Sequence, residues 1–557
     1  MAKKSIINTY IVILTGLILF NCANPLPPGG GEIDKIPPEV VEVYPPNGTT
    51  NFSGDEIEIS LSEWCDKRSV QNAIFISPQI NILEYSWTGK TLTISFDDTL
   101  KPNTTYTVTV GTDIEDLNNR NKMTEAFNFV FSTGSKIDIC QVNGNVYDKE
   151  QAGIMIYAYK KNGEDITPSE IKPNYLTQVG TNGNYKLLGL SEGEYRIFAI
   201  RDKFRDLIYD VEEDDFGVPF SDIFLSEKDS IFTGLNYLIT TRDTTKPHLI
   251  NVTNTDKNNI LVECSEPINI SKLSTLDFYI YDSTNDGSVD IKYLFKGKAK
   301  DNFFFLSFKN DFNEDDELFL IANKLIDMSN NITENERVEL VPNVKPDTSY
   351  PKIFKTETDY GNNLIDYDSA TITLYLDEGF NTKEQNNLIQ FVNKSNQIFN
   401  SEINYPDDAT MNIKIIDKLK QKEDYKLKVD FSKIVDAAGN KIDSVFSFDF
   451  NTVSETNFSG VSGKIIKKGT EKVVVILQSI LKEGRNYKYN CENSNFKFEK
   501  VIPGDYFLWS FIDKNEDGEY NFGEVLPFQP AEVFTFHPDT ISLRARWPIE
   551  DVIIKFE

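Results

Sequence analysis

The chain has 557 residues and a formal net charge of −29. This length is too great for one all-β domain and suggests about four or five domains. The negative charge argues against electrostatic binding of nucleic acid or of acidic lipid headgroups. With only two histidines, His248 and His537, the chain has little material for a histidine-based catalytic triad or a histidine-rich metal centre. High counts of Phe (39) and Tyr (25) favour strands over helices.

Residues 1–31 have the pattern of an export signal followed by a tether. Two lysines precede an apolar run at 6–20, which has the length of a signal-peptide core and is short for a membrane span. The run leads to Cys22, and a Pro/Gly-rich stretch follows. A cysteine in this place resembles the lipobox of bacterial lipoproteins, which implies cleavage before Cys22 and acylation of its thiol and new amine. Several acyl chains make a stable anchor; the alternative is an ordinary secretory signal with a chance cysteine.

A repeat occupies three stretches, 36–134, 244–346 and 347–455. Each alternates apolar and polar residues in short runs separated by Asn, Gly, Pro and Asp, which is typical of antiparallel strands in a sandwich of about 100 residues. In each, an acid after the second strand precedes a turn aspartate, with separations of 53, 61 and 58 residues. The pairs are Glu63 and Asp116, Glu266 and Asp327, and Glu378 (beside Asp377) and Asp436. Recurrence at one repeat position predicts a structural role at a strand end, rather than the paired carboxylates of a glycosidase.

The motifs of these repeats resemble a known module. The first carries IPPEVVEVYPPNG at 36–48, Ser-Glu-Trp after its second strand and the turn IEDLNNRNK at 114–122, and the third carries DAAGN at 436–440. The three repeats look like the bacterial Ig-like modules described from surface-layer proteins. The first repeat has nearly all of the features, and the other two lack the Pro-rich details.

Two further stretches, 135–243 and 456–557, share a different pattern. Each has an early Gly-x-(Val/Ile) and then (Glu/Pro)-Gly-(Glu/Asp)-Tyr before a strand, at 192–195 and 503–506. This pattern looks like the prealbumin-like sandwich of carboxypeptidase regulatory domains. The whole order resembles a group of Ig-like-domain lipoproteins from Bacteroidota, a resemblance that implies architecture and location but no activity.

The predicted fold is therefore all-β, a tandem array of Ig-like and prealbumin-like β-sandwiches after a lipoprotein signal peptide. The predicted segments are a signal peptide at 1–21, a lipidated cysteine and flexible tether at 22–35, Ig-like domains at 36–134, 244–346 and 347–455, and carboxypeptidase-regulatory-like sandwiches at 135–243 and 456–557.

One motif carries metal chemistry. Residues 513–524 fit D-x-[DN]-x-[DN]-G-x5-E, a spacing that can supply the six to eight oxygens that calcium needs. The candidate ligands are Asp513, Asn515, Asp517, the Glu519 carbonyl, Asn521 and Glu524. The preceding segment has the pattern of a strand, so the loop would lie between strands. The other interpretation is an acidic hairpin whose Asp, Asn and Gly serve turn geometry; no other cofactor is expected.

Two other residue types lead to simpler expectations. No Cys-x-x-Cys occurs, so the cysteines of the body are expected to be buried free thiols. They are Cys65, Cys140, Cys264 and Cys491. The tryptophans are expected in the aromatic cores of the sandwiches. They are Trp64, Trp87, Trp509 and Trp547.

No P-loop, GxSxG, HExxH or dinucleotide-binding fingerprint occurs, so we expect no enzyme. The predicted function is that of a non-enzymatic, outer-membrane-anchored envelope lipoprotein, held through Cys22, that presents its modules to a protein or glycan ligand. The alternative is a periplasmic scaffold or accessory protein for envelope assembly or transport. Residues 23–31 contain no acid, whereas some Bacteroidota surface-export signals place acids there, which favours the periplasmic face.

Overall fold

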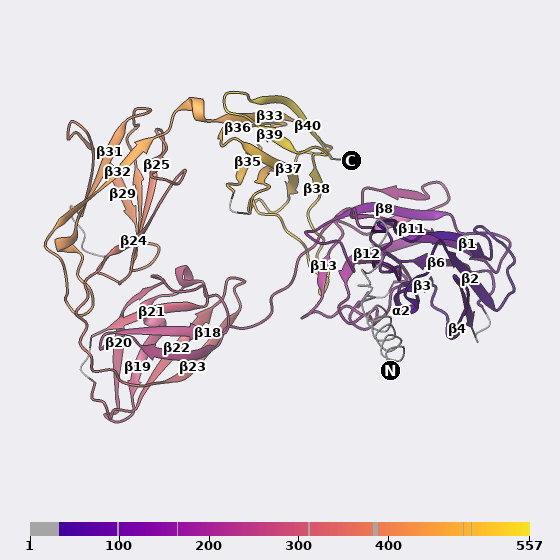
Figure 1. Ribbon diagram of the computed structural model, residues 1–557, viewed down its shortest axis with the longest axis horizontal. Helices are drawn as coiled ribbons and strands as arrows, with labels where there is room; N and C mark the ends of the chain where they lie inside the picture. Colours follow the sequence, from indigo (N-terminus) through magenta and orange to yellow (C-terminus); the bar gives the residue numbers. More distant parts are fainter. Residues whose placement is uncertain are drawn as a thin grey trace, which may run out of the picture. The chain divides into compact units, whose positions relative to one another are not determined.

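The computed structural model describes residues 33–96, 100–163, 165–309, 312–382, 388–482, 484–491 and 493–556 (Figure 1). The predicted signal and Cys22 lie outside these residues. The described chain forms two compact units, one within Met1–Thr240 and Phe522–Ala531 and the other within Thr241–Asn521 and Glu532–Glu557. The predicted all-β array of sandwiches is confirmed: the described residues contain many short strands and a single α-helix, α2 (Lys67–Asn72). No helix among them is long and apolar enough to cross a membrane.

The first sandwich has two antiparallel sheets, in the orders β1-β2-β5-β4 and β3-β6-β7. Its strands are β1 (Val40–Tyr44), β2 (Glu56–Leu61), β3 (Ile74–Ser77), β4 (Ile82–Thr88), β5 (Thr91–Phe96), β6 (Thr105–Val110) and β7 (Phe127–Ser132). In β2 the apolar residues Ile57, Ile59 and Leu61 alternate with more exposed ones, as a strand with one face on the core requires.

The second sandwich, also in the first unit, has sheets that centre on β12 and β8. Its strands are β8 (Cys140–Tyr147), β9 (Met155–Lys160), β10 (Tyr175–Gln178), β11 (Asn184–Leu190), β12 (Gly193–Arg201), β13 (Asp215–Gly217), β14 (Ile223–Leu225), β15 (Ile231–Thr233) and β16 (Tyr237–Leu238). The early glycine of its pattern, Gly144, lies on β8, and a Cβ there would come 2.0 Å from the Leu235 carbonyl oxygen. Glycine is therefore required by the close approach of a neighbouring backbone.

In the second unit, the sandwich at 244–346 forms one continuous path of strands, β17-β18-β21-β20-β19-β22-β23. These are β17 (Leu249–Asn254), β18 (Asn259–Cys264), β19 (Phe278–Asp282), β20 (Gly287–Phe295), β21 (Phe303–Phe308), β22 (Leu318–Ile326) and β23 (Ile332–Leu340). The first half of the long strand β20 pairs with β19 and its second half with β21, so β20 passes from one sheet of the sandwich to the other.

The sandwich at 347–455 has sheets in the orders β24-β26-β30-β29 and β25-β32-β31-β27-β28. Its strands are β24 (Ile353–Thr358), β25 (Leu364–Ile365), β26 (Thr371–Leu376), β27 (Ile389–Asn393), β28 (Ile398–Phe399), β29 (Ser401–Asn404), β30 (Thr410–Ile415), β31 (Asp424–Asp430) and β32 (Val445–Thr452).

The last sandwich has sheets β36-β33-β40 and β35-β34-β37-β38, with β39 paired to β37. Its strands are β33 (Ser459–Ile466), β34 (Lys472–Ser479), β35 (Tyr487–Cys491), β36 (Asn495–Val501), β37 (Gly504–Asp513), β38 (Phe534–Phe536), β39 (Ile541–Leu543) and β40 (Ile549–Lys555). Gly463 repeats the role of Gly144, because a Cβ there would lie 1.9 Å from the Val552 carbonyl oxygen. The shared Gly-x-(Val/Ile) pattern thus marks one steric requirement in two sandwiches.

The four body cysteines are free and buried, as expected. The expectation for the tryptophans is wrong at two positions, since Trp64 and Trp547 are 56% and 74% exposed. Trp64 follows β2 and Trp547 precedes β40, so both lie outside the strands whose alternation directs side chains into a core.

Candidate functional site

The predicted calcium loop begins where β37 ends. The Asp513 Oδ2 atom accepts a hydrogen bond from the Gly518 backbone (3.0 Å), and the Asp517 Oδ1 atom accepts one from the Glu519 backbone (2.7 Å). The Asn515 side chain donates to Asp517 Oδ2 at 2.8 Å. These bonds are the turn contacts that Asp, Asn and Gly favour. The Oδ1 atom of Asp513, whose side chain is almost fully buried, has no hydrogen-bond partner.

A further acid, Glu532, lies at this loop and is not part of the sequence motif. It accepts hydrogen bonds from the backbones of Lys514 (2.7 Å) and Asn521 (3.1 Å). Burial, together with the charges of Asp513 and Asp517, raises the pKa of Glu532. The loop motif does not predict Glu532, because a ten-residue segment that belongs to the other unit separates Glu532 from the loop in sequence.

The last predicted ligand, Glu524, lies in that segment, Phe522–Ala531. The segment adds Val525 and Ala531 to an aromatic core of the second sandwich, and the Phe528 ring packs 3.5 Å from the Arg196 guanidinium carbon. Glu524 therefore belongs to one compact unit, and the other predicted ligands belong to the second unit.

The repeat acids form three equivalent triads. In each, an aspartate that lies before the first strand of the module joins the acid after the second strand and the turn aspartate, with one oxygen from each lying within 4.8 Å of the others. We call them the first, second and third triads. They are Asp34, Glu63 and Asp116; Asp243, Glu266 and Asp327; and Asp347, Glu378 and Asp436. The sequence pattern identified two members of each triad and missed the first, because that residue lies before the strands of its module.

In the first two triads, the turn aspartate has hydrogen bonds to both oxygens. Asp116 accepts from the Asn119 backbone (2.7 Å) and from the Asn121 side chain (2.7 Å). Asp327 accepts from the backbone (2.7 Å) and the side chain (2.8 Å) of Asn331. Burial opposes ionisation of Asp116, but these donors outweigh it and lower its pKa.

The third triad carries more unbalanced negative charge. Burial raises the pKa of Glu378 to about 8, with the charges of Asp347, Asp436 and Asp377 adding to the shift. Asp377 itself forms an ion pair with Lys298 at 3.2 Å. Lys292 lies near Asp436, with its Nζ atom 3.5 Å from the Asp436 carbonyl oxygen.

Close to this triad, the modules at 244–346 and 347–455 are joined by shared packing. Tyr293 and Phe295 lie on β20 of the former, but their side chains belong to the hydrophobic core of the latter. The backbone of Leu294 donates to Asp408 Oδ2 (2.9 Å), and the backbone of Asp408 donates back to the Leu294 carbonyl (3.2 Å). The joint between these two sandwiches is fixed by both apolar and polar contacts.

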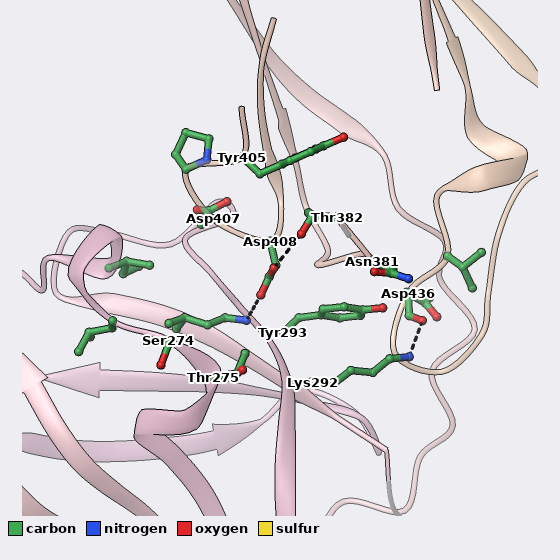
Figure 2. Close-up of a pocket in the computed structure, with 15 residues that line it drawn as sticks. Ser274, Thr275, Lys292, Tyr293, Asn381, Thr382, Tyr405, Asp407, Asp408 and Asp436 are labelled. Carbon is green, nitrogen blue, oxygen red and sulfur yellow. Dashed lines mark hydrogen bonds between the residues drawn. The ribbon is translucent and has the colours of Figure 1, made fainter. Parts of the chain in front are cut away.

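A pocket of about 620 Å³ opens at this joint (Figure 2). Lys292 and Tyr293 come from one module, and Thr382, Tyr405 and Asp408 come from the other. The volume lies within the range of small-ligand sites, and the lining combines tyrosine rings with amide, hydroxyl and charged groups. Such a lining can take a polar ligand with an apolar face.

Comparison with known proteins relates parts of the chain to a known family. A family described as bacterial Ig-like domain matches residues 34–133 and 347–452. A search of curated proteins found no match to the chain. The match agrees with the Ig-like character predicted for these two stretches.

Solved structures share only a distant likeness. The N-terminal part of the bacterial S-layer protein SbsC is 10% identical, with 38% of this chain and 45% of that chain covered and a TM-score of 0.17. BcpA, the major pilin subunit of Bacillus cereus, is 10% identical, with 75% and 99% covered and a TM-score of 0.14. The N-terminal four Ig domains of Dscam1 isoform 8.4 are 9% identical, with 73% and 97% covered and a TM-score of 0.16. The chain thus spans less than half of the SbsC fragment.

Proposed function

We propose that the protein is a non-enzymatic cell-envelope lipoprotein that presents tandem β-sandwiches for binding or adhesion. The fixed joint at Tyr293 and Phe295 is the observation that carries this proposal. A joint that shares a hydrophobic core holds the loops of two modules in one arrangement, which a presenting surface needs and a flexible linker does not give. The match to bacterial Ig-like domains supports an extracellular or envelope location.

The binding surface that we propose is the pocket at this joint. Tyrosine rings beside amide, hydroxyl and carboxylate groups suit a glycan or a polar protein loop, because the rings stack on apolar faces while the polar groups fix orientation. The net charge of −29 disfavours a nucleic-acid ligand. We further propose that the part of the predicted loop that lies within the second unit, with Asp513, Asn515 and Asp517, binds calcium; the unpartnered Asp513 Oδ1 atom is its strongest support.

Anchoring is proposed through Cys22. A Cys22→Ala variant expressed in the native host should leave the membrane fraction and appear in the soluble fraction. The matched control is Cys491→Ala, which changes a buried cysteine of the last sandwich and should stay with the membrane. Equal membrane partition of the wild type and the Cys22→Ala variant would overturn the lipoprotein assignment.

A periplasmic scaffold for envelope assembly or transport is the second candidate. The absence of acidic residues at 23–31 favours it, since some surface-export signals carry acids there. Screening of glycans and envelope proteins with the wild type and a Tyr405→Ala variant separates the two functions. Presentation predicts a ligand whose binding is weakened by the variant, whereas a scaffold predicts crosslinks to envelope machinery that the variant leaves unchanged.

A further inference from the structure

The third triad joins three separate parts of the chain. Asp347 lies in the segment between β23 and β24, Glu378 follows β26, and Asp436 follows the 3-10 helix η3 (Phe431–Lys433). Their carboxylate oxygens lie within 4.8 Å of one another. Asp436 is only 2% exposed, and its Oδ2 atom is buried without a hydrogen-bond partner. The Oε2 atom of Glu378 is also buried and without a partner.

A buried glutamate oxygen without a partner also occurs in the second triad, at Glu266 Oε1, but only the third triad has a turn aspartate with such an oxygen. In the first two triads, the side-chain amide of Asn121 or Asn331 donates both to the turn aspartate and to the carbonyl of the aspartate before the module. In the third triad, the equivalent Asn440 side chain donates to the Asp347 carbonyl at 3.3 Å. The Asp436 carboxylate accepts hydrogen bonds from the backbones of Gly439 and Asn440, and both reach its Oδ1 atom. Oδ2 thus lies against the other acids of the triad, with no amide or cationic donor from outside them.

The charged groups near the glutamate also differ between the three triads. Lys90 lies near Glu63 in the first triad, and His248 lies near Glu266 in the second. Around Glu378, the largest electrostatic influences are the acids Asp347, Asp436 and Asp377. Lys292 lies nearby, but its hydrogen bonds go to the carbonyl oxygens of Asp436 and Ala437 and not to a carboxylate of the triad. Part-buried carboxylates are costly unless a cation or hydrogen-bond donors compensate their charge.

We propose that Asp347, Glu378 and Asp436 bind a calcium ion at the base of the module at 347–455. Carboxylate oxygens are hard ligands that calcium prefers, and calcium accepts the irregular, water-completed geometry that three carboxylates from different segments provide. Magnesium fits less well because it demands a near-ideal octahedron. The site is separate from the 513–524 loop and does not depend on the proposed ligand-binding function.

The ion would secure the joint between two modules. Asp347 lies before β24, in the segment that leads into the sandwich at 347–455, and its Oδ2 atom also accepts a hydrogen bond from the Asn259 side chain of the preceding module at 3.2 Å. A calcium ion that holds Asp347 to Glu378 and Asp436 therefore ties this segment to the sandwich that follows, while Asn259 ties it to the preceding one.

The test uses the full-length protein in detergent, stripped with EDTA and titrated with calcium chloride. Calorimetric titration should show one calcium ion fewer per chain for Glu378→Gln than for the wild type, or an affinity at least about tenfold weaker at one site, since even outer-shell partners matter by that much. The matched control is Glu63→Gln, the equivalent change in the first triad, which should bind calcium as the wild type does.

Thermal unfolding gives a second readout that a purely structural role would not reproduce. In EDTA at pH 9, above the pKa of about 8 that Glu378 has without the ion, Glu378→Gln should melt at a higher temperature than the wild type, because one of the repelling carboxylates is gone. In calcium, the wild type should gain stability at this module and the variant should gain much less. The proposal is overturned if calcium binding and the calcium-dependent melting shift are the same in Glu378→Gln, Glu63→Gln and the wild type.

Discussion

The Phe295→Ala variant tests whether the joint between the modules at 244–346 and 347–455 is a shared core. Phe295 is 1% exposed, lies on β20 of the preceding module and stacks on Phe305 with ring centroids 5.3 Å apart. Its side chain nevertheless packs in the core of the following module. Truncation of a fully buried Phe to Ala typically costs about 3–5 kcal/mol, through lost transfer free energy and the cavity left behind. We expect a loss of that size in the module at 347–455, although the substituted residue lies outside it in sequence.

Scanning calorimetry of the full chain measures this effect. The variant should lower the melting temperature of the transition that contains the module at 347–455 and should separate it from the transition of the preceding module. The control is Phe354→Ala, which removes a ring that is 36% exposed on β24. The reasoning is refuted if Phe295→Ala costs less than about 1 kcal/mol or no more than the control, because a shared core cannot lose a buried ring so cheaply.

Two further predictions concern acids elsewhere in the chain. Burial opposes ionisation of Asp222, but hydrogen bonds from Arg196 (2.8 Å) and Lys161 (2.7 Å) outweigh it and lower its pKa below the ordinary 3.8. A lowered folded-state pKa gives stability that is present above pH 3.8 and is lost as the pH falls through the folded value. The melting temperature of the wild type should therefore fall more steeply than that of Asp222→Asn as the pH is lowered from 4 to 2. Equal slopes for the two proteins would contradict the assignment. At the acidic loop, Asp513→Asn should weaken a calcium site by at least about tenfold in calorimetric titration. Unchanged titration would leave the loop as a hairpin turn.

The strands were readily predicted because their alternation is local. The segment EIEISL buries every second side chain in β2, as a strand with one covered face must. The same alternation failed for β6, TYTVTV, which is buried along its whole length. Its threonines face the second sandwich, where Thr107 donates to the Leu188 carbonyl at 2.9 Å and Thr109 donates to the Leu176 carbonyl at 3.3 Å. A partner from another module leaves no local signal in the strand that it covers.

In the candidate sites, too, local contacts were predictable from the sequence and tertiary contacts were not. The turn bonds of Asp116 and Asp513 were predictable, because Asp in an Asn/Gly-rich loop accepts from nearby backbone groups. Asp347 and Glu532 were missed, because each reaches its cluster through the tertiary fold rather than through sequence spacing. The lack of a donor at Asp436 Oδ2 could not be predicted from the sequence either, because an asparagine stands at the same turn position in both modules. The Asn331 amide donates to the Asp327 carboxylate, whereas the Asn440 amide donates to the Asp347 carbonyl.

The most direct test of the proposed function is protease treatment of intact cells and of lysed cells, with detection of the C-terminal sandwich by an antibody. Presentation of the modules for binding or adhesion predicts that the signal is lost from intact cells. Survival of the signal until lysis would contradict that function and favour the periplasmic scaffold.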